Sequence, residues 1–132
     1  PRMVDVSAKT ETKRTAIARS VVHISASTLE LLKAKALPKG DVLTVAQIAG
    51  IMAAKRTSEF IPMCHPLALT HTDVRFLVRD EPPSVLIEAS ASTSDRTGVE
   101  MEAIIGAQIA AATIYDMVKA VQKDVMMPRP AR

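Results

Sequence analysis

The chain has 132 residues, a formal net charge of +3, 48% hydrophobic residues and only 2% aromatic residues. This length fits one domain with a single core, and a small charge excess without aromatic stacking platforms argues against a nucleic-acid partner. We expect a cytoplasmic protein without a membrane partner, because the chain has one cysteine, no signal-peptide pattern and no apolar run of about 18 residues.

The first part of the chain predicts an arm, a strand and a short helix. Residues 1–13 are polar with scattered charges and predict an extended arm. Residues 15–25 alternate in hydropathy and are rich in β-branched side chains, which is typical of a strand. Residues 27–36 predict a short helix that ends at Leu37-Pro38, because the residue before a proline disfavours helical backbone.

A longer helix follows a turn at Lys39-Gly40. Glycine permits a tight turn there, so we expect Lys39 just ahead of the helix. Thr44 and Gln47 fit a capping box at its start. The helical spacing of apolar residues predicts a buried stripe of Val45, Ile48, Ala49, Met52 and Phe60.

The segment after this helix is a candidate site. Pro62 and Pro66 bracket Met63, Cys64 and His65 and restrict the backbone on both sides, so the three side chains are expected on a rigid connector. Adjacent Cys and His are poor metal-ligand spacing, and no second ligand pair exists, so we expect no metal site. His65 as a proton-transfer or anion-binding group is a stronger hypothesis than Cys64 as a nucleophile.

The spacing in residues 67–91 predicts two antiparallel strands joined at Glu81-Pro82-Pro83-Ser84. Alternation predicts a shared face made of Thr70, Thr72, Val74, Phe76, Val78, Val85, Ile87, Ala89 and Ala91. The order strand, helix, helix, two strands, helix predicts a single α+β domain over residues 1–132. Its expected form is a ferredoxin-like antiparallel sheet with helices packed on one face. Residues 125–132 predict an irregular tail.

Residues 98–124 form the longest uninterrupted helical pattern in the chain. Thr97 and Glu100 fit a capping box at its start. The period of about 100° per residue predicts a core stripe. That stripe comprises Ile104, Ala107, Ala110, Ala111, Ile114, Met117, Val118 and Val121.

The opposite face of this helix mixes charged and apolar side chains. Its members are Glu102, Ile105, Ile109, Ala112, Asp116, Lys119 and Lys123. Apolar residues within a charged face suggest that a partner subunit or a ligand covers it; the alternative is a solvated Asp116–Lys119 pair. Glu102 and Asp116 are about 21 Å apart along a helix. A long substrate could contact both, or residues of two subunits could converge.

Six sequence motifs together resemble the MoaC family. They are MVDVSAK at 3–9, KGDV at 39–42, AGIMAAKRT at 49–57, IPMCHPLALT at 61–70, TGVEMEA at 97–103 and IYDMVKAVQKD at 114–124. The resemblance spans nearly the whole chain. It implies a lyase of molybdenum cofactor biosynthesis, which converts 3′,8-cyclo-7,8-dihydro-GTP into cyclic pyranopterin monophosphate and releases pyrophosphate.

The resemblance also implies roles for particular residues. Asp116 would be the catalytic acid/base, with Lys119 and Lys39 as further catalytic residues. The substrate-binding residues would be Met63, Cys64, His65, Glu100, Met101, Glu102 and, from the arm, Arg14. No cofactor is implied, although Mg²⁺ with the triphosphate stays open. The implied assembly is a homohexamer, a trimer of dimers with sites at subunit interfaces.

Two rival classes are a non-catalytic ferredoxin-like ligand-sensing or assembly module and a nucleotide phosphohydrolase. The first leaves the proline-bracketed Cys-His pair unexplained, and the second usually has a glycine-rich phosphate loop or paired metal carboxylates. MoaC proteins usually continue past the long helix into a strand and a Lys/Gly/Ser-rich tail that carries another pocket lysine. Without such a tail, we expect impaired turnover, with Arg129 or Arg132 as a substitute.

Overall fold

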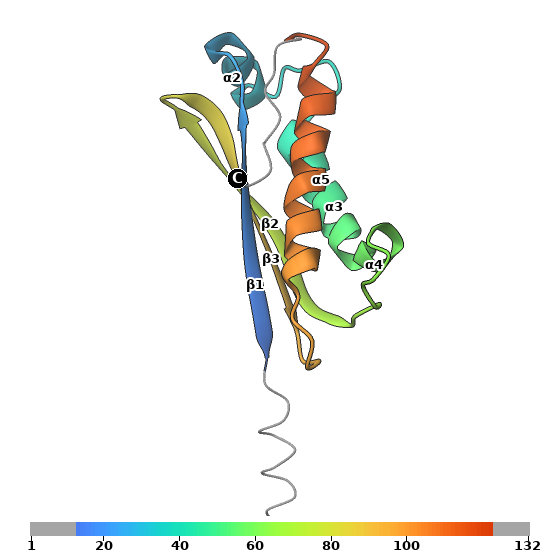
Figure 1. Cartoon of the computed structure of the whole chain (residues 1–132). Coiled ribbons are helices and arrows are strands. Elements are labelled where there is room, and N and C mark those ends of the chain that lie inside the picture. The colour runs from blue at the N-terminus through green and yellow to red at the C-terminus, as the bar shows by residue number, and fades with distance from the viewer. Residues whose placement is uncertain (1–12, 123–132) are drawn as a thin grey trace, which may run out of the picture.

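The computed structural model describes residues 13–122, which form one α+β unit. Its elements are β1 (Arg14–His23), α2 (Ala26–Lys33), α3 (Val42–Lys55), α4 (Thr57–Phe60), β2 (Leu69–Asp80), β3 (Pro83–Thr93) and α5 (Glu100–Val118). The antiparallel sheet has the order β1-β3-β2, and α3 and α5 lie side by side on one of its faces (Figure 1). The predicted α+β class and element order are confirmed, with α4 as an additional short helix.

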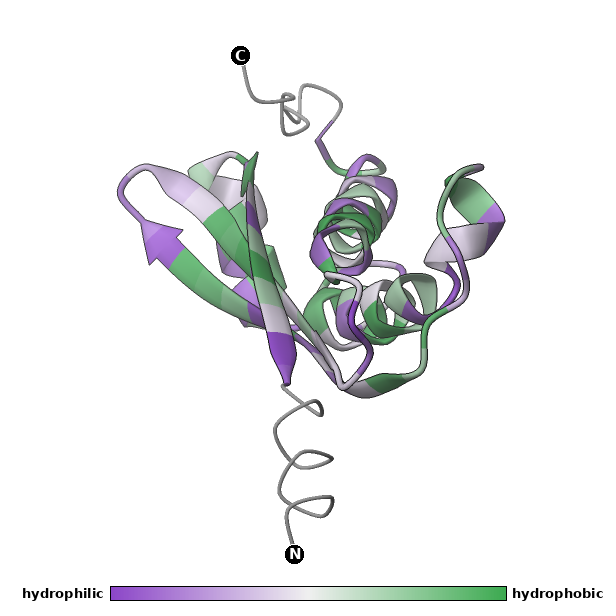
Figure 2. Ribbon diagram, turned by 60° about the horizontal axis from the view of Figure 1, so that its bottom comes forward, coloured by the Kyte–Doolittle hydropathy of each residue, from purple (hydrophilic) through white to green (hydrophobic). Residues whose placement is uncertain are grey.

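The connectivity follows the ferredoxin-like pattern, with three strands among residues 13–122. The predicted arm, apart from Lys13, and the predicted tail lie outside the described residues, as do Lys123, Arg129 and Arg132. Figure 2 shows hydrophobic residues running through the strands and both long helices, whereas the β2–β3 turn is hydrophilic.

The strands alternate as predicted. On β3, Val85, Ile87, Ala89 and Ala91 are all buried against the helices. Val74 of β2 is also fully buried and pairs with Ala89. Thr70 departs from the prediction: it is exposed, because a register shift between Leu69 and His71 interrupts the alternation at the start of β2.

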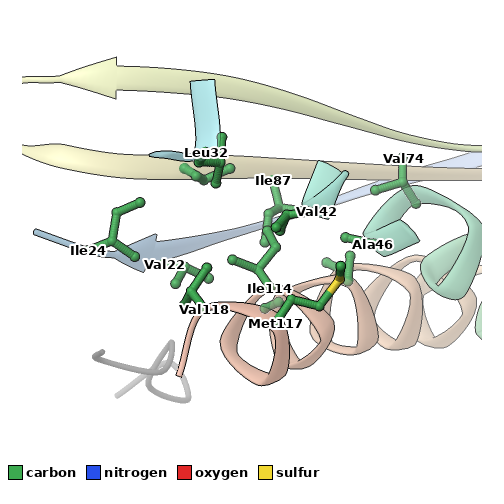
Figure 3. Close-up of a cluster of buried hydrophobic side chains, with 14 of the residues drawn as sticks. Val22, Ile24, Leu32, Val42, Ala46, Val74, Ile87, Ile114, Met117 and Val118 are labelled. Atoms are coloured by element: carbon green, nitrogen blue, oxygen red, sulfur yellow. The ribbon is translucent and has the colours of Figure 1, made fainter. Parts of the chain in front are cut away.

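The core lies between the sheet and the two long helices. Figure 3 shows Val22 of β1 and Ile87 of β3 gathered with Val42 of α3 and with Ile114 and Met117 of α5. The core stripe predicted for α5 is wrong at two positions. Ile104 is exposed on α5, and Val121 is exposed beyond the end of the helix. The remaining members of that stripe are buried.

The predicted stripe of α3 is wrong, since the helix faces the core with its small residues. Val45, Ile48 and Met52 are each about half exposed, and Phe60, on α4, is too. The buried set is Val42, Ala46, Gly50, Ala53 and Ala54. A Cβ on Gly50 would lie 2.8 Å from the main-chain oxygen of Gly106, so the helices approach too closely there for larger side chains.

Neither predicted capping box is formed. Asp41 caps α3, where its side chain accepts hydrogen bonds from the main-chain N and the hydroxyl of Thr44. Helix α5 begins after Val99 without a side-chain cap, and it ends at Val118 rather than at residue 124. The box predicted at Thr44 begins three residues after the observed cap, Asp41. The box predicted at Thr97 makes no side-chain capping hydrogen bond at the start of α5.

The expectation that no segment is apolar enough to cross a membrane also needs correction. Helix α5 has 19 residues with a mean hydropathy of 1.2, so its length and composition alone would permit crossing. Half of its apolar window is buried inside the domain, where it packs on the sheet. These are the properties of the core helix of a globular domain.

Candidate functional site

The predicted site residues gather at the two ends of α5. Asp116 lies in its last turn, whereas Glu100, Met101 and Glu102 form its first turn. Fourteen residues separate Glu102 from Asp116, so the two ends are about 21 Å apart along the helix. One chain therefore does not bring all the predicted residues around one small reacting centre.

At the C-terminal end, Lys39, Asp116 and Lys119 form a lysine–aspartate cluster. The Lys39 ammonium donates to Asp116 Oδ2 at 3.1 Å and to the Asp116 main-chain oxygen at 3.4 Å. Lys119 Nζ lies 3.1 Å from Asp116 Oδ1. The hydrogen bond from Lys39 and then that from Lys119 lower the pKa of the Asp116 carboxyl below its usual value. The three side chains are about half exposed, so an incoming ligand can reach them.

The turn before α3 places Lys39 beside Asp116. Gly40 has a φ of 102°, a conformation that favours glycine, and its main-chain N donates to the Leu37 oxygen at 3.0 Å. Leu37 is buried, which anchors the turn, and Asp41 then caps α3. The loop before α3 consequently passes beside the C-terminal end of α5 (Figure 1).

At the N-terminal end of α5 there is a cavity of about 220 Å³. It is lined by Met63, Cys64, His65, Leu67, Thr97, Gly98, Glu100, Met101 and Glu102. Glu102 is only 4% exposed, and its carboxylate has no hydrogen-bond or ion-pair partner among residues 13–122. Met63, by contrast, is 90% exposed, which is unusual for a large apolar side chain. We call this space the acidic cavity.

Packing fixes the connector that forms one wall of the acidic cavity. The Cys64 main-chain N donates to the Ile61 oxygen at 3.0 Å, which closes a turn over residues 61–64 that contains Pro62. Leu67 then packs against a small core cluster that includes Val99 and Ala103. The proline-bracketed segment is thus tied to the first turn of α5, as a rigid site requires.

A second cavity, of about 500 Å³, lies beside the first and is called the basic cavity here. Its lining comprises Lys13, Arg14, Thr15, Ala16, Ile17, Gly98, Val99 and Glu100. Gly98 and Glu100 line both cavities. Arg14 is therefore placed next to the acidic cavity but not beside the lysine–aspartate cluster at the other end of α5.

Eight residues that line the two cavities were not predicted as site residues: Lys13, Thr15, Ala16, Ile17, Leu67, Thr97, Gly98 and Val99. Thr97 was interpreted as half of a capping box with Glu100, which was itself a candidate site residue. Lys13 could have been predicted as a site residue, because it is a second cation next to the candidate Arg14. Within residues 13–122, no group of three or more His, Cys, Asp or Glu side chains is arranged to hold a metal ion.

Fold and site together define a class: a ferredoxin-like α+β protein with acid, base and cationic side chains at both ends of its long core helix. The chain belongs to the MoaC family, whose model matches residues 3–129. Its curated relatives named cyclic pyranopterin monophosphate synthase include one from Nitratidesulfovibrio vulgaris, 69% identical over 95% of this chain and 78% of the relative. Another, from Desulfovibrio desulfuricans, is 61% identical over 96% of this chain and 78% of the relative. A third, from Listeria monocytogenes, is 51% identical over 97% of this chain and 79% of the relative.

Proposed function

We propose that this chain is a cyclic pyranopterin monophosphate synthase, a lyase of molybdenum cofactor biosynthesis. Membership of the MoaC family and 69% identity to a relative of that name support the activity. Its substrate would be 3′,8-cyclo-7,8-dihydro-GTP, and its products the cyclic pyranopterin monophosphate and pyrophosphate. The observation that carries the proposal is the Asp116 carboxylate held between Lys39 and Lys119.

The lysine–aspartate cluster supplies the acid–base chemistry in this account. Asp116 is ionised at neutral pH because both lysines stabilise its charged form. When phosphate oxygens of the substrate take over hydrogen bonds from Lys39 and Lys119, the carboxylate loses the groups that lower its pKa. It then becomes a stronger base at the moment when a proton must be removed, and it can return that proton later in the reaction.

The two cavities supply recognition. The ring system of the substrate carries N–H donors, and Glu100 and Glu102 offer carboxylate acceptors for them in the acidic cavity. Met63, Cys64 and Met101 give this cavity an apolar wall, and His65 offers a donor on its rim. Arg14 and Lys13 place two cations in the basic cavity, where the triphosphate would be bound.

The separation of the two ends of α5 argues for a shared site. We propose that the lysine–aspartate cluster of one subunit faces the acidic cavity of a neighbour, within a cytoplasmic hexamer built as a trimer of dimers. Apolar side chains that the single chain leaves exposed support association: Val45, Ile48, Met52 and Met63. The half-buried Ile105 and Ile109 lie on the same helix as both groups of site residues.

The direct test is incubation of the full chain with the cyclised nucleotide, followed by mass detection of the pyranopterin and of pyrophosphate. Formation of both products, and their absence with Asp116→Asn, would support the proposal. Binding of the nucleotide without turnover would favour the rival class, a ligand-sensing module on the same fold.

A further inference from the structure

Gly98 is a glycine whose backbone does not require one. Among residues 13–122, the glycine with positive φ is Gly40, at 102°. Gly98 therefore lies outside the left-handed region of backbone conformation that favours glycine. Its place between β3 and α5 also leaves it outside the close helix packing that explains Gly50. The reason for a glycine at this position must be the space that a side chain would take.

That space is occupied by the carboxyl group of Glu100. A Cβ on Gly98 would overlap both carboxylate oxygens of Glu100 and would lie 2.7 Å from its Cδ. Real Cβ atoms essentially never come this close to another heavy atom. The Glu100 side chain is exposed, and among residues 13–122 no hydrogen bond or ion pair competes with its place in the gap above Gly98.

The position matters because Gly98 and Glu100 line the acidic and the basic cavity alike. The carboxylate in the gap consequently lies where the two cavities meet. A ligand that extends from the buried Glu102 toward Arg14 would pass this point.

We propose that Gly98 is a positioning residue: its missing side chain seats the Glu100 carboxylate at the junction of the two cavities. The inference rests on the proposed function, in which Glu100 accepts hydrogen bonds from N–H or hydroxyl donors of the substrate. Any larger residue at position 98 moves this acceptor away from the junction.

Gly98→Ala tests the proposal with little risk to the fold. The atoms that the new methyl group meets are the end of a flexible side chain, so Glu100 moves and the backbone does not. We expect the unfolding temperature to stay within about 3 °C of the parent. The KM for the cyclised nucleotide should rise about tenfold, the effect of one lost hydrogen bond of average strength.

A double-mutant comparison separates positioning from a general effect of the methyl group. Glu100→Ala alone should raise KM, and adding Gly98→Ala to it should change nothing further, since no carboxylate is left to displace. Gly106→Ala, a glycine-to-alanine change within α5 that meets only ordinary contacts, should leave KM unchanged. An equal effect of Gly98→Ala with and without Glu100, or parent-like kinetics of the single variant, would overturn the inference.

A structural readout keeps this test independent of the proposed function. A crystal structure of Gly98→Ala should show the Glu100 carboxylate displaced from the gap, and an unmoved carboxylate would overturn the inference even if the parent shows no turnover. Absence of product with the parent protein would count against the proposed function alone.

Discussion

The charged side chains at the C-terminal end of α5 pair with one another, whereas within residues 13–122 the carboxylates at its N-terminal end have no ion pair. Asp116 is 54% exposed and still engages two lysines, one on each carboxylate oxygen. Glu102 is 4% exposed, yet no partner among residues 13–122 reaches its carboxylate. Water can solvate the first group, whereas the second has little exposed surface and gains more from each hydrogen-bond donor. In the proposed function, the paired end exchanges its partners during the reaction, and the N-terminal end receives hydrogen-bond donors from the ligand.

Asp116→Asn should have the largest effect at the paired end. The amide cannot accept a proton, so we expect kcat to fall about 1000-fold, while nucleotide binding and the unfolding temperature change little. Single-turnover assays and calorimetry measure these quantities. The matched control is Asp80→Asn, which alters another exposed aspartate paired with a lysine, Lys33. Normal turnover by Asp116→Asn would remove the catalytic assignment.

Lys39→Ala should have the next largest kinetic effect, and it should also change how kcat/KM depends on pH. Because the Lys39 hydrogen bond is the main cause of the lowered pKa of Asp116, its loss raises that pKa toward the ordinary value. The ionised base is then lost at a higher pH, so the acidic limb of the kcat/KM profile moves upward. We also expect about a 100-fold lower kcat/KM from the missing phosphate contact. Lys33→Ala is the control, and an unmoved acidic limb would contradict this account.

Glu102→Gln should have the smallest of these three kinetic effects, and it tests the N-terminal end. Loss of a charged acceptor predicts about a 30-fold lower kcat/KM. Within residues 13–122 no ion pair depends on Glu102, which is 4% exposed, so the loss of its charge should leave the unfolding temperature equal or raise it. Calorimetry of the free protein measures this. A marked loss of stability would show that Glu102 is a structural residue satisfied within the fold.

The sequence allowed the class of fold and most of the strand alternation to be predicted, and it supplied the candidate site residues on which the proposed function is based. Alternation is a local property, so Val85, Ile87 and Ala89 were placed correctly on the inner face of β3. Periodicity on α3 was ambiguous, because a stripe of large apolar residues and a stripe of small ones both recur with helical spacing. Only the approach to α5 at Gly50 decides between them.

The parts of the site that could not be predicted depend on distances between elements. No pattern in the sequence reveals that the turn at Lys39 reaches Asp116, which lies 77 residues further along the chain. In the same way, the helical pattern at residues 97–100 suggested a capping box, and only coordinates show that the Glu100 carboxylate fills the gap over Gly98.

A subunit-mixing assay tests most directly whether the two ends of α5 meet across subunits. Asp116→Asn and Glu102→Gln are each denatured and then refolded together, and the activity is compared with that of each variant refolded alone. If one subunit supplies the lysine–aspartate cluster and its neighbour the acidic cavity, mixed oligomers contain sites with both intact halves. Activity should then recover to about a quarter of the parent value, as random pairing in two-subunit sites predicts. Recovery no greater than the average of the two separate variants, in mixed oligomers verified by mass spectrometry, would contradict the account.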